Sequence, residues 1–330
     1  MSSTQSGPRF QFVWLYRLPE HFLCIVVGLL SWLIEKKAPV FCRSFSWEDP
    51  AISAEHKDKS TFPTWSLIPM AILAAALVII VEWFRARSAK AGAWYLDRDA
   101  SAGSQEEISS EMAVVCREGG ENQRDHQSGG TTSAEQSAVT NNGPGASWGS
   151  RRSLFWQTVS VWVLTFLLSI MFSTFIVACI KVYVGRLRPD FIQRLKRDGY
   201  TKQSNAPDLC GAAREGRLSF PSGHSSAAFS AMTPLTVYLL GLFRAFGGLC
   251  IWRVAVSLLP MCLAIVIAAS RTRDNRHHFS DVIGGSLIGA VFALLSVGLF
   301  FRFSRKAFLV PRRLELARRR DGALVNENPV

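Results

Sequence analysis

Five long runs without a charged residue restrict what this chain can fold into more than any other feature. A helix needs about 20 mostly apolar residues to cross a bilayer, and four of the runs reach that length. A weaker candidate over 21–34 becomes long enough if its helix begins earlier. We therefore expect an all-α membrane protein, a bundle of six transmembrane helices. The five runs cover residues 60–81, 153–180, 218–243, 254–270 and 282–301.

The composition agrees with a membrane protein. Of the 330 residues, 48% are hydrophobic, which is too apolar for an ordinary soluble domain that carries a long polar segment. The net charge is +12, but the cations flank the apolar runs and no nucleic-acid motif accompanies them. We therefore expect membrane lipids, and no nucleic acid, as partners of this charge. The sequence does not specify an oligomeric state.

The positions of Lys and Arg predict an orientation. Six spans place both termini on one side of the membrane, and basic residues cluster at the span ends of that side, within 85–90, 151–152 and 302–313. Because cytoplasmic loops carry an excess of Lys and Arg, both termini are expected to be cytoplasmic. The loop 181–217 on the opposite side is also basic, and phosphate binding supplies a separate reason for its arginines. We expect a multi-pass protein of an endomembrane or the plasma membrane.

The chain divides into four parts by composition. Residues 10–90 hold the first two spans and an outer loop, and residues 151–305 hold spans three to six. Residues 91–150 are rich in Ser, Gly, Glu, Gln and Asn and cannot bury enough apolar surface to offset the entropy of ordering. This segment is predicted to be a disordered cytoplasmic insert. Residues 306–330 are predicted to form a basic cytoplasmic tail that anionic headgroups attract.

Cysteine spacing indicates no metal site, because the seven cysteines include no Cys-x-x-Cys pair. Cys42 and Cys210 fall in two loops on the same predicted side of the membrane. A disulfide between them is one alternative, and two free thiols are the other, since pairing does not follow from sequence.

A first cationic stretch follows the third predicted span and reads Lys181-Val-Tyr-Val-Gly-Arg-Leu-Arg188-Pro189. Arginine offers a planar fork of donors that suits phosphate oxygens, and lysine offers a point charge. Taken alone, the stretch is more typical of a cationic belt at the membrane surface. Arg186 is interpreted as such an interfacial charge.

The second stretch opens the fourth predicted span and contains Pro221-Ser222-Gly223-His224. Backbone amides at a helix N-terminus point at a bound anion, and glycine allows close approach of a ligand. The Ser222 hydroxyl adds another donor. His224 can move a proton near neutral pH, although a lone histidine at a helix start is more often structural.

The third stretch joins the fifth and sixth spans and contains Arg271, His277, His278 and Asp281. His277 and Asp281 are four residues apart and share a face if both are helical. The carboxylate then accepts from one ring nitrogen and leaves the other lone pair free to attack. His278 is three residues before Asp281, so helical spacing alone does not choose between the two histidines. Asp274 and its basic neighbours are interpreted as interfacial charges.

Two small residues follow this third stretch in the sixth span. Gly285 and Gly289 form a small-xxx-small face that should let the span pack closely against a neighbour. All three stretches therefore adjoin apolar spans, and together they hold fixed cations, two imidazoles and a carboxylate. These groups suffice to cleave a phosphate ester without a metal, and their place at span ends favours a phosphate on a lipid.

Together the stretches resemble the type 2 phosphatidate phosphatase superfamily, and within it the lipid phosphate phosphatase and diacylglycerol pyrophosphate phosphatase branch. The family's pattern is Lys-x6-Arg-Pro, Pro-Ser-Gly-His and Ser-Arg-x5-His-x3-Asp, and each element is present here in order and at the same spacing. The resemblance covers about 10–90 and 150–305. It departs from many relatives in the first outer loop, where residues 53–57 read Ser-Ala-Glu-His-Lys.

The resemblance implies a six-span bundle of the acid phosphatase and vanadium haloperoxidase type. It also implies a catalytic site at the luminal or extracellular surface, activity independent of magnesium, and no cofactor or metal. His277 is the implied nucleophile, His224 the implied acid and then base, and Asp281 the implied partner of His277. The residues implied to bind the phosphoryl oxygens are Lys181, Arg188, Ser222, Gly223 and Arg271.

We therefore expect a hydrolase that releases inorganic phosphate from a lipid phosphate monoester through a phosphohistidine. Phosphatidate and diacylglycerol pyrophosphate are the leading substrates. Three alternatives stay open: a phosphotransferase that uses an alcohol in place of water, a binding protein without activity, and a transporter. Loss of a key histidine or arginine would favour the binding protein, and none is lost here.

Overall fold

The computed structural model describes residues 16–87, 148–204, 206–212, 214–243, 245, 251–303 and 309–311. By their contacts, the described residues belong to a main unit, within 1–83 and 156–330, and a second unit, within 84–155. Of the second unit, the described residues are the end of one helix and the start of another. Everything that follows concerns the main unit.

Among the described residues, six helices are long and apolar enough to cross a membrane. This confirms the predicted all-helical fold of six spans. Shorter helices and one pair of strands complete the described chain. The spans are α2 (Leu18–Lys37), α3 (Leu67–Arg87, preceded by the 3₁₀ turn η2, Thr64–Ser66), α6 (Trp148–Val184), α9 (Gly223–Leu242), α10 (Ile251–Arg273) and α11 (Phe279–Phe300). The remaining elements are η1 (Pro50–Ile52), α7 (Phe191–Arg197), α8 (Ala206–Gly211), η4 (Arg214–Arg217), β1 (Phe301–Phe303) and β2 (Leu309–Pro311).

Local signals explain where the spans begin. The first span starts at Leu18, earlier than the apolar run, because Pro19 suits the first turn of a helix. Helix α9 starts five residues after the beginning of its run, because Ser222 caps it. Helix α6 begins at Trp148, so the last three residues of the segment predicted as disordered are helical. The rest of the predicted insert, up to residue 147, lies outside the described residues.

The end of the sixth span differs from the prediction. Phe301, predicted as the last residue of the span, begins β1 and pairs with Pro311 of the antiparallel strand β2. The phenyl ring of Phe301 lies 4.3 Å from the indole of Trp162, centroid to centroid, so the hairpin closes the core. The tail predicted from 306 onward therefore includes a strand, and residues 306–308 and 312–330 lie outside the described residues.

Helix α9 lies at the centre of the bundle and packs against α10 and α11. The close packing predicted for Gly285 and Gly289 is confirmed. A methyl group built at Gly285 would lie 3.1 Å from the carbonyl carbon of Ser222, and one at Gly289 would lie 3.0 Å from that of Ser226. In both cases the carbonyl oxygen is nearer still. The backbones of α9 and α11 therefore touch where the site is built.

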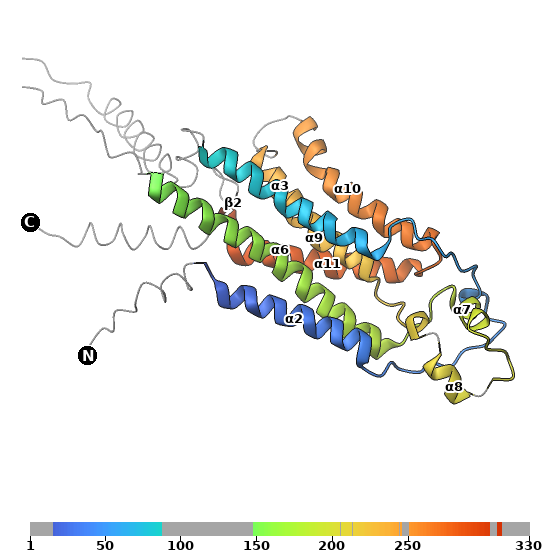
Figure 1. Ribbon diagram of the computed structural model, residues 1–330. Coiled ribbons are helices and arrows are strands. Elements are labelled where there is room, and N and C mark those ends of the chain that lie inside the picture. The colour runs from blue at the N-terminus through green and yellow to red at the C-terminus, as the bar shows by residue number, and fades with distance from the viewer. Residues whose placement is uncertain are drawn as a thin grey trace, which may run out of the picture. The chain divides into compact units, whose positions relative to one another are not determined.

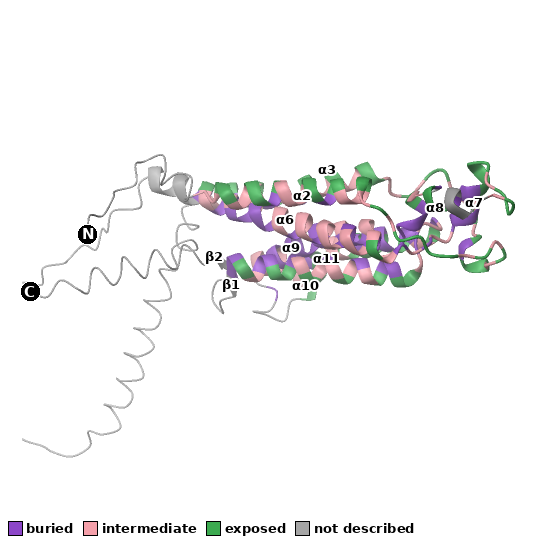
Figure 2. Cartoon of the chain, turned by 90° about the horizontal axis from the view of Figure 1, so that it is seen from below, coloured by how far each residue is buried: buried purple, intermediate pink, exposed green. Residues whose placement is uncertain are grey.

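The outward faces of the spans are apolar and exposed. Figure 2 shows exposed and half-buried residues along α2 and α3, while buried residues face the interior. Large examples are Phe22, Trp32 and Ile72, exposed by 68%, 60% and 61%. Such faces fit a hydrocarbon environment, which agrees with the six spans.

Short helices and loops cover one end of the bundle. Figure 1 shows α7 and α8 at this end and β2 at the other. Cys42 and Cys210 form a disulfide here, which resolves the alternative left open by the sequence. The guanidinium of Arg217 is buried over the ring of Phe191 and donates to the carbonyl oxygens of Arg43 and Leu209. These contacts hold the first outer loop against the segment between α6 and α9.

Candidate active site

The three sequence stretches meet at the end of the bundle that α7 and α8 cover. Lys181 lies in the last turn of α6 and Arg271 in the last turn of α10. His224 is in the first turn of α9, and His277 is in the turn that joins α10 to α11. Main-chain hydrogen bonds join the stretches directly. The amide of Ser219 donates to the carbonyl of Arg186, and the amide of Ser222 donates to that of Asp281.

A cavity of about 610 Å³ lies between these elements. Among the described residues, most of the predicted site residues line it, namely Lys181, Arg188, Gly223, His224, Arg271 and His277. Ser222 and Asp281 are buried and do not line the cavity. The structure therefore brings both histidines and three of the predicted cations to one cavity.

His277 is held by a main-chain acceptor. Its side chain is buried, and Nδ1 lies 2.8 Å from the carbonyl oxygen of Ser219. A carbonyl oxygen only accepts, so Nδ1 carries the hydrogen and Nε2 keeps its lone pair. Burial, and then Arg188 and Lys181, lower the pKa of His277, whereas Asp281 raises it. The resulting pKa is about 4. The ring is therefore neutral near pH 7, and the lone pair of Nε2 is available.

Asp281 is placed differently from the expectation. His277 precedes α11, so the two residues do not share a helical face, and Nδ1 lies 3.7 Å from the nearer carboxylate oxygen. That separation is too long for a hydrogen bond. Instead the carboxylate accepts from the hydroxyl of Ser219 at 2.6 Å and from the amide of His278 at 2.9 Å. Asp281 therefore contacts His277 through Ser219.

Arg186, interpreted from sequence as an interfacial charge, is a partner of this carboxylate. Its Nη1 donates to Oδ1 of Asp281 at 2.7 Å and to the hydroxyl of Ser280. The His278 ring, the other histidine of the pair, reaches the carbonyl of Leu187 through Nε2 at 3.1 Å. The two adjacent histidines therefore have different hydrogen-bond partners, and only His277 of the two lines the cavity.

His224 and Arg188 both carry a buried polar atom without a protein partner. Within the described part of the chain, Nε2 of His224 and Nε of Arg188 have no hydrogen-bond partner. Buried polar groups are normally paired, so two such atoms on one cavity need an explanation. Burial, and then the nearby Arg194, lower the pKa of Arg188 to about 10, which leaves it cationic at neutral pH. A ligand bound in the cavity would supply partners for both atoms.

The Ser222 and Gly223 positions suit an anion at the start of α9. The oxygen of Ser222 accepts from the amide and the hydroxyl of Ser225, which leaves the Ser222 hydrogen free to donate elsewhere. A side chain at Gly223 would meet Nζ of Lys181 at 3.3 Å. Glycine therefore lets the ammonium group come close to the helix N-terminus.

Two of the predicted cations have carboxylate partners that the sequence did not indicate. Nη2 of Arg271 lies 2.9 Å from Oδ2 of Asp274, which was interpreted as an interfacial charge and is buried. Asp274 also accepts from the amide and hydroxyl of Thr61, and so joins Arg271 to the first outer loop. Nζ of Lys181 lies 2.8 Å from Oε1 of Glu35 at the end of α2.

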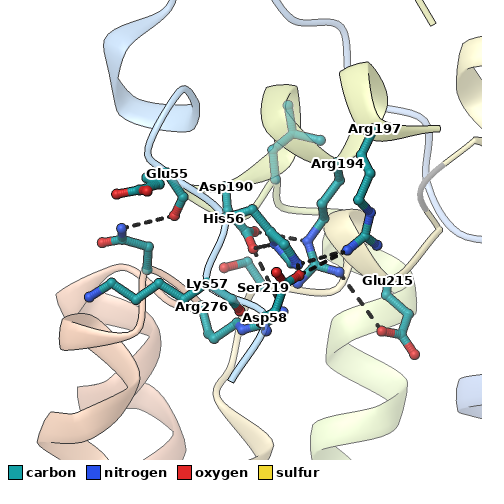
Figure 3. A network of polar contacts seen from close by, with 12 residues as sticks. Glu55, His56, Lys57, Asp58, Asp190, Arg194, Arg197, Glu215, Ser219 and Arg276 are labelled. Atoms are coloured by element: carbon teal, nitrogen blue, oxygen red, sulfur yellow. Dashed lines mark hydrogen bonds and ion pairs between the residues drawn. The ribbon is translucent and has the colours of Figure 1, made fainter. Parts of the chain in front are cut away.

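A network around the fully buried Asp190 holds the outer loop over the site. Figure 3 shows its carboxylate among His56, Arg194 and Arg276. Oδ2 lies 2.6 Å from Nδ1 of His56, and Oδ1 accepts from Nε of Arg194 at 3.0 Å. Burial alone would raise the pKa of Asp190, but its bonds from Arg194 and His56 hold it below the usual value. His56 therefore joins the stretch 53–57 to the segment that carries Arg188.

The sequence motifs missed Glu35, Arg186, Ser219 and Asp274, which hold the motif residues in place. Ser219 and Arg186 lie within or next to motif stretches, so proximity was the available signal. Glu35 is 146 residues from Lys181 along the chain, and the pairing depends on how α2 packs.

Part of the chain is similar to known proteins. Residues 162–305 match the model of the PAP2 superfamily. A PA-phosphatase related-family protein of Dictyostelium discoideum is 38% identical over 157 residues, which cover 45% of this chain and 52% of the relative. Lipid phosphate phosphatase 2 of Arabidopsis thaliana is 36% identical over 146 residues, with coverages of 42% and 50%. Diacylglycerol pyrophosphate phosphatase 1 of Saccharomyces cerevisiae is 41% identical over 132 residues, with coverages of 37% and 46%.

The aligned part of the chain spans about half the length of these curated relatives. No solved structure matches. The matched segment contains every motif residue of the candidate site, three whole spans and most of α6. Over residues 162–305, the chain is therefore similar to the PAP2 superfamily.

Proposed function

We propose that the protein hydrolyses lipid phosphate monoesters without a metal, through a phosphohistidine intermediate, and releases inorganic phosphate. The observation that carries the proposal is the shared cavity, where His224 and His277 lie with Lys181, Arg188 and Arg271 at the end of an apolar bundle. Phosphoryl transfer needs little beyond positioning and compensation of charge on the nonbridging oxygens. The three cations and the start of α9 supply both.

In the first step, Nε2 of His277 attacks phosphorus while the bond from phosphorus to the lipid oxygen breaks. His224 donates a proton to the departing alkoxide. Its otherwise unpartnered Nε2 supports this role. Ser219 holds the other nitrogen of His277 and keeps the attacking lone pair in place. In the second step, His224 removes a proton from water, the water oxygen bonds to phosphorus, and the bond to His277 breaks.

A lipid phosphate is the substrate class that fits the cavity. Trp32 of α2, Leu67 of α3 and Ala227 of α9 give the same cavity an apolar wall. Relatives named lipid phosphate phosphatase and diacylglycerol pyrophosphate phosphatase support the same class. Phosphatidate and diacylglycerol pyrophosphate are the leading candidates.

We also propose that the site faces the lumen or the cell exterior, with both termini in the cytoplasm. The Cys42–Cys210 disulfide lies at the same end of the bundle as the site, and disulfides persist in oxidising compartments. A reporter fused to the C-terminus tests the orientation. In sealed vesicles whose cytoplasmic face points outward, an external protease should cleave the reporter, and protection of the reporter there would contradict the proposed orientation.

The test of the activity uses purified protein in mixed micelles with excess chelator. Phosphate release is measured for phosphatidate, lysophosphatidate, diacylglycerol pyrophosphate and sphingosine phosphate. His277→Ala should abolish release, whereas His21→Ala, in the first turn of α2, should retain it. Labelled substrate should leave an acid-labile phosphoryl group on the wild-type protein only. Phosphate release by the His277→Ala protein at the wild-type rate would remove the nucleophile assignment. Transfer of the phosphoryl group to an added alcohol, without release of phosphate, would indicate a phosphotransferase.

A further inference from the structure

Lys181, one of the cations on the candidate phosphate site, is held by a carboxylate that also lines the cavity. Nζ of Lys181 lies 2.8 Å from Oε1 of Glu35. The lysine side chain is 7% exposed and the glutamate side chain 39%, so the pair reaches from the interior to the open part of the cavity. A negative charge within a site for a doubly charged anion opposes binding of that anion.

The backbone around Glu35 is fixed. Nη2 of Arg214 donates to the carbonyl of Glu35 at 2.9 Å and to that of Ala38 at 2.7 Å. These bonds attach the end of α2 to η4, which precedes the start of α9. The position of the carboxylate is therefore built into the fold.

Lys181 has two possible anionic partners at this site. Its ammonium group lies next to Gly223 at the start of α9, where a phosphoryl group is expected to bind, and it contacts Glu35 from the other side. A phosphoryl group must share this cation with Glu35 or displace it. The other two cations differ in this respect, because Arg271 is paired with Asp274 outside the cavity lining, and Nε of Arg188 has no partner among the described residues.

We propose that Glu35 competes with phosphate for Lys181 and so lowers the affinity of the site for inorganic phosphate, which speeds release of the product. The inference rests on the proposed function for its meaning in the reaction cycle. When inorganic phosphate leaves, Lys181 returns to Glu35, so its buried ammonium group keeps an anionic partner. Glu35 is thus an affinity-determining residue of the phosphate site.

The decisive variant is Glu35→Gln, which keeps the shape of the side chain and removes its charge. The matched control is Glu48→Gln, because Glu48 pairs with Lys202 in an exposed ion pair of the outer loops. Binding of inorganic phosphate is measured directly by calorimetry on the detergent-solubilised protein, with no lipid substrate present. The dissociation constant should fall about tenfold or more in Glu35→Gln, as expected for removal of one charge a few ångströms from the anion, and it should not change in the control.

The same variant should show stronger product inhibition. With phosphatidate as substrate, the inhibition constant of phosphate should fall by the factor seen in binding, with kcat reduced because release is slower. The double variant Glu35→Gln, Lys181→Gln should lose the gain, since the gain depends on the freed ammonium group. If the ion pair has only a structural role, Glu35→Gln should lower the melting temperature and leave phosphate affinity unchanged or weaker. Unchanged or weaker phosphate affinity overturns the proposal.

A second variant covers the case in which Glu35→Gln does not fold. Glu35→Asp keeps the charge and withdraws it by one methylene from Lys181, so phosphate affinity should rise by a smaller factor. An unchanged affinity in that variant also refutes competition for Lys181. Because binding is measured without turnover, tighter phosphate binding in a protein that releases no phosphate from any lipid would reject the proposed function and retain this inference.

Discussion

Replacement of Gly285 by alanine would place a methyl group against the backbone that carries the candidate site. The added carbon would lie 3.1 Å from the carbonyl carbon and 3.2 Å from the nitrogen of Ser222, with the carbonyl oxygen nearer still. Carbon atoms in ordinary contact are about 3.5–4.0 Å apart, so α11 and the start of α9 must separate by about 1 Å. Neither backbone yields as a flexible side chain would.

The expected cost in activity follows from what this contact positions. The amide of Ser222 bonds to the carbonyl of Asp281 at 2.9 Å, one turn before Gly285 on the same helix. Separation of the two backbones therefore moves His224 relative to His277. A shift of 1 Å in a catalytic group can cost about 100-fold, and we expect kcat/KM for phosphatidate to fall by roughly that factor.

Gly298 on the same helix provides the matched control, since a methyl group there meets no atom of the described residues within 4 Å. Gly298→Ala should keep full activity. Melting temperatures of both variants separate loss of geometry from loss of the fold. If Gly285→Ala retains wild-type kcat/KM in phosphate release, the close contact does not position the site and the reasoning is wrong.

Two further predictions concern His277 and its partner Ser219. Because burial lowers the pKa of His277 to about 4, the neutral ring persists well below pH 6.5. After correction for ionisation of the substrate, the acidic limb of kcat/KM that reports protonation of His277 should lie near pH 4, and an acidic limb near pH 6.5 would contradict this. Ser219→Ala removes the donor to Asp281 and keeps the carbonyl that binds His277. We expect kcat about tenfold lower with little change in KM and partial recovery in Ser219→Thr, whereas an unchanged kcat would exclude the link through Ser219.

The spans and the meeting of the motifs followed from sequence because both depend on local composition and order along the chain. Five charge-free runs and a weaker candidate over 21–34 predicted the six spans, and the glycines of the last span predicted its close packing. Lengths were less accurate, since caps and prolines decide where a helix begins. The Ser222 cap, for example, sets the start of α9.

The partners of the site residues did not follow from sequence, because they come from distant segments. Spacing suggested a direct contact between His277 and Asp281, but the turn before α11 places Ser219 between them. Asp274 and Arg186 resembled surface charges because nothing in their local sequence indicates burial or a carboxylate partner. Such pairings depend on which helices pack together, and this information is spread over the whole chain.

The walls of the cavity have two different origins. The side with the histidines and arginines belongs to segments 162–305, which main-chain hydrogen bonds join to one another. The opposite side, with Trp32, Glu35 and Leu67, belongs to α2 and α3, outside the matched segment. Substitutions in α2 or α3 therefore change the surface offered to the lipid and leave the main-chain bonds around the histidines intact. A chain built this way can acquire a new substrate preference, or a new rate of product loss, without rebuilding its reactive groups.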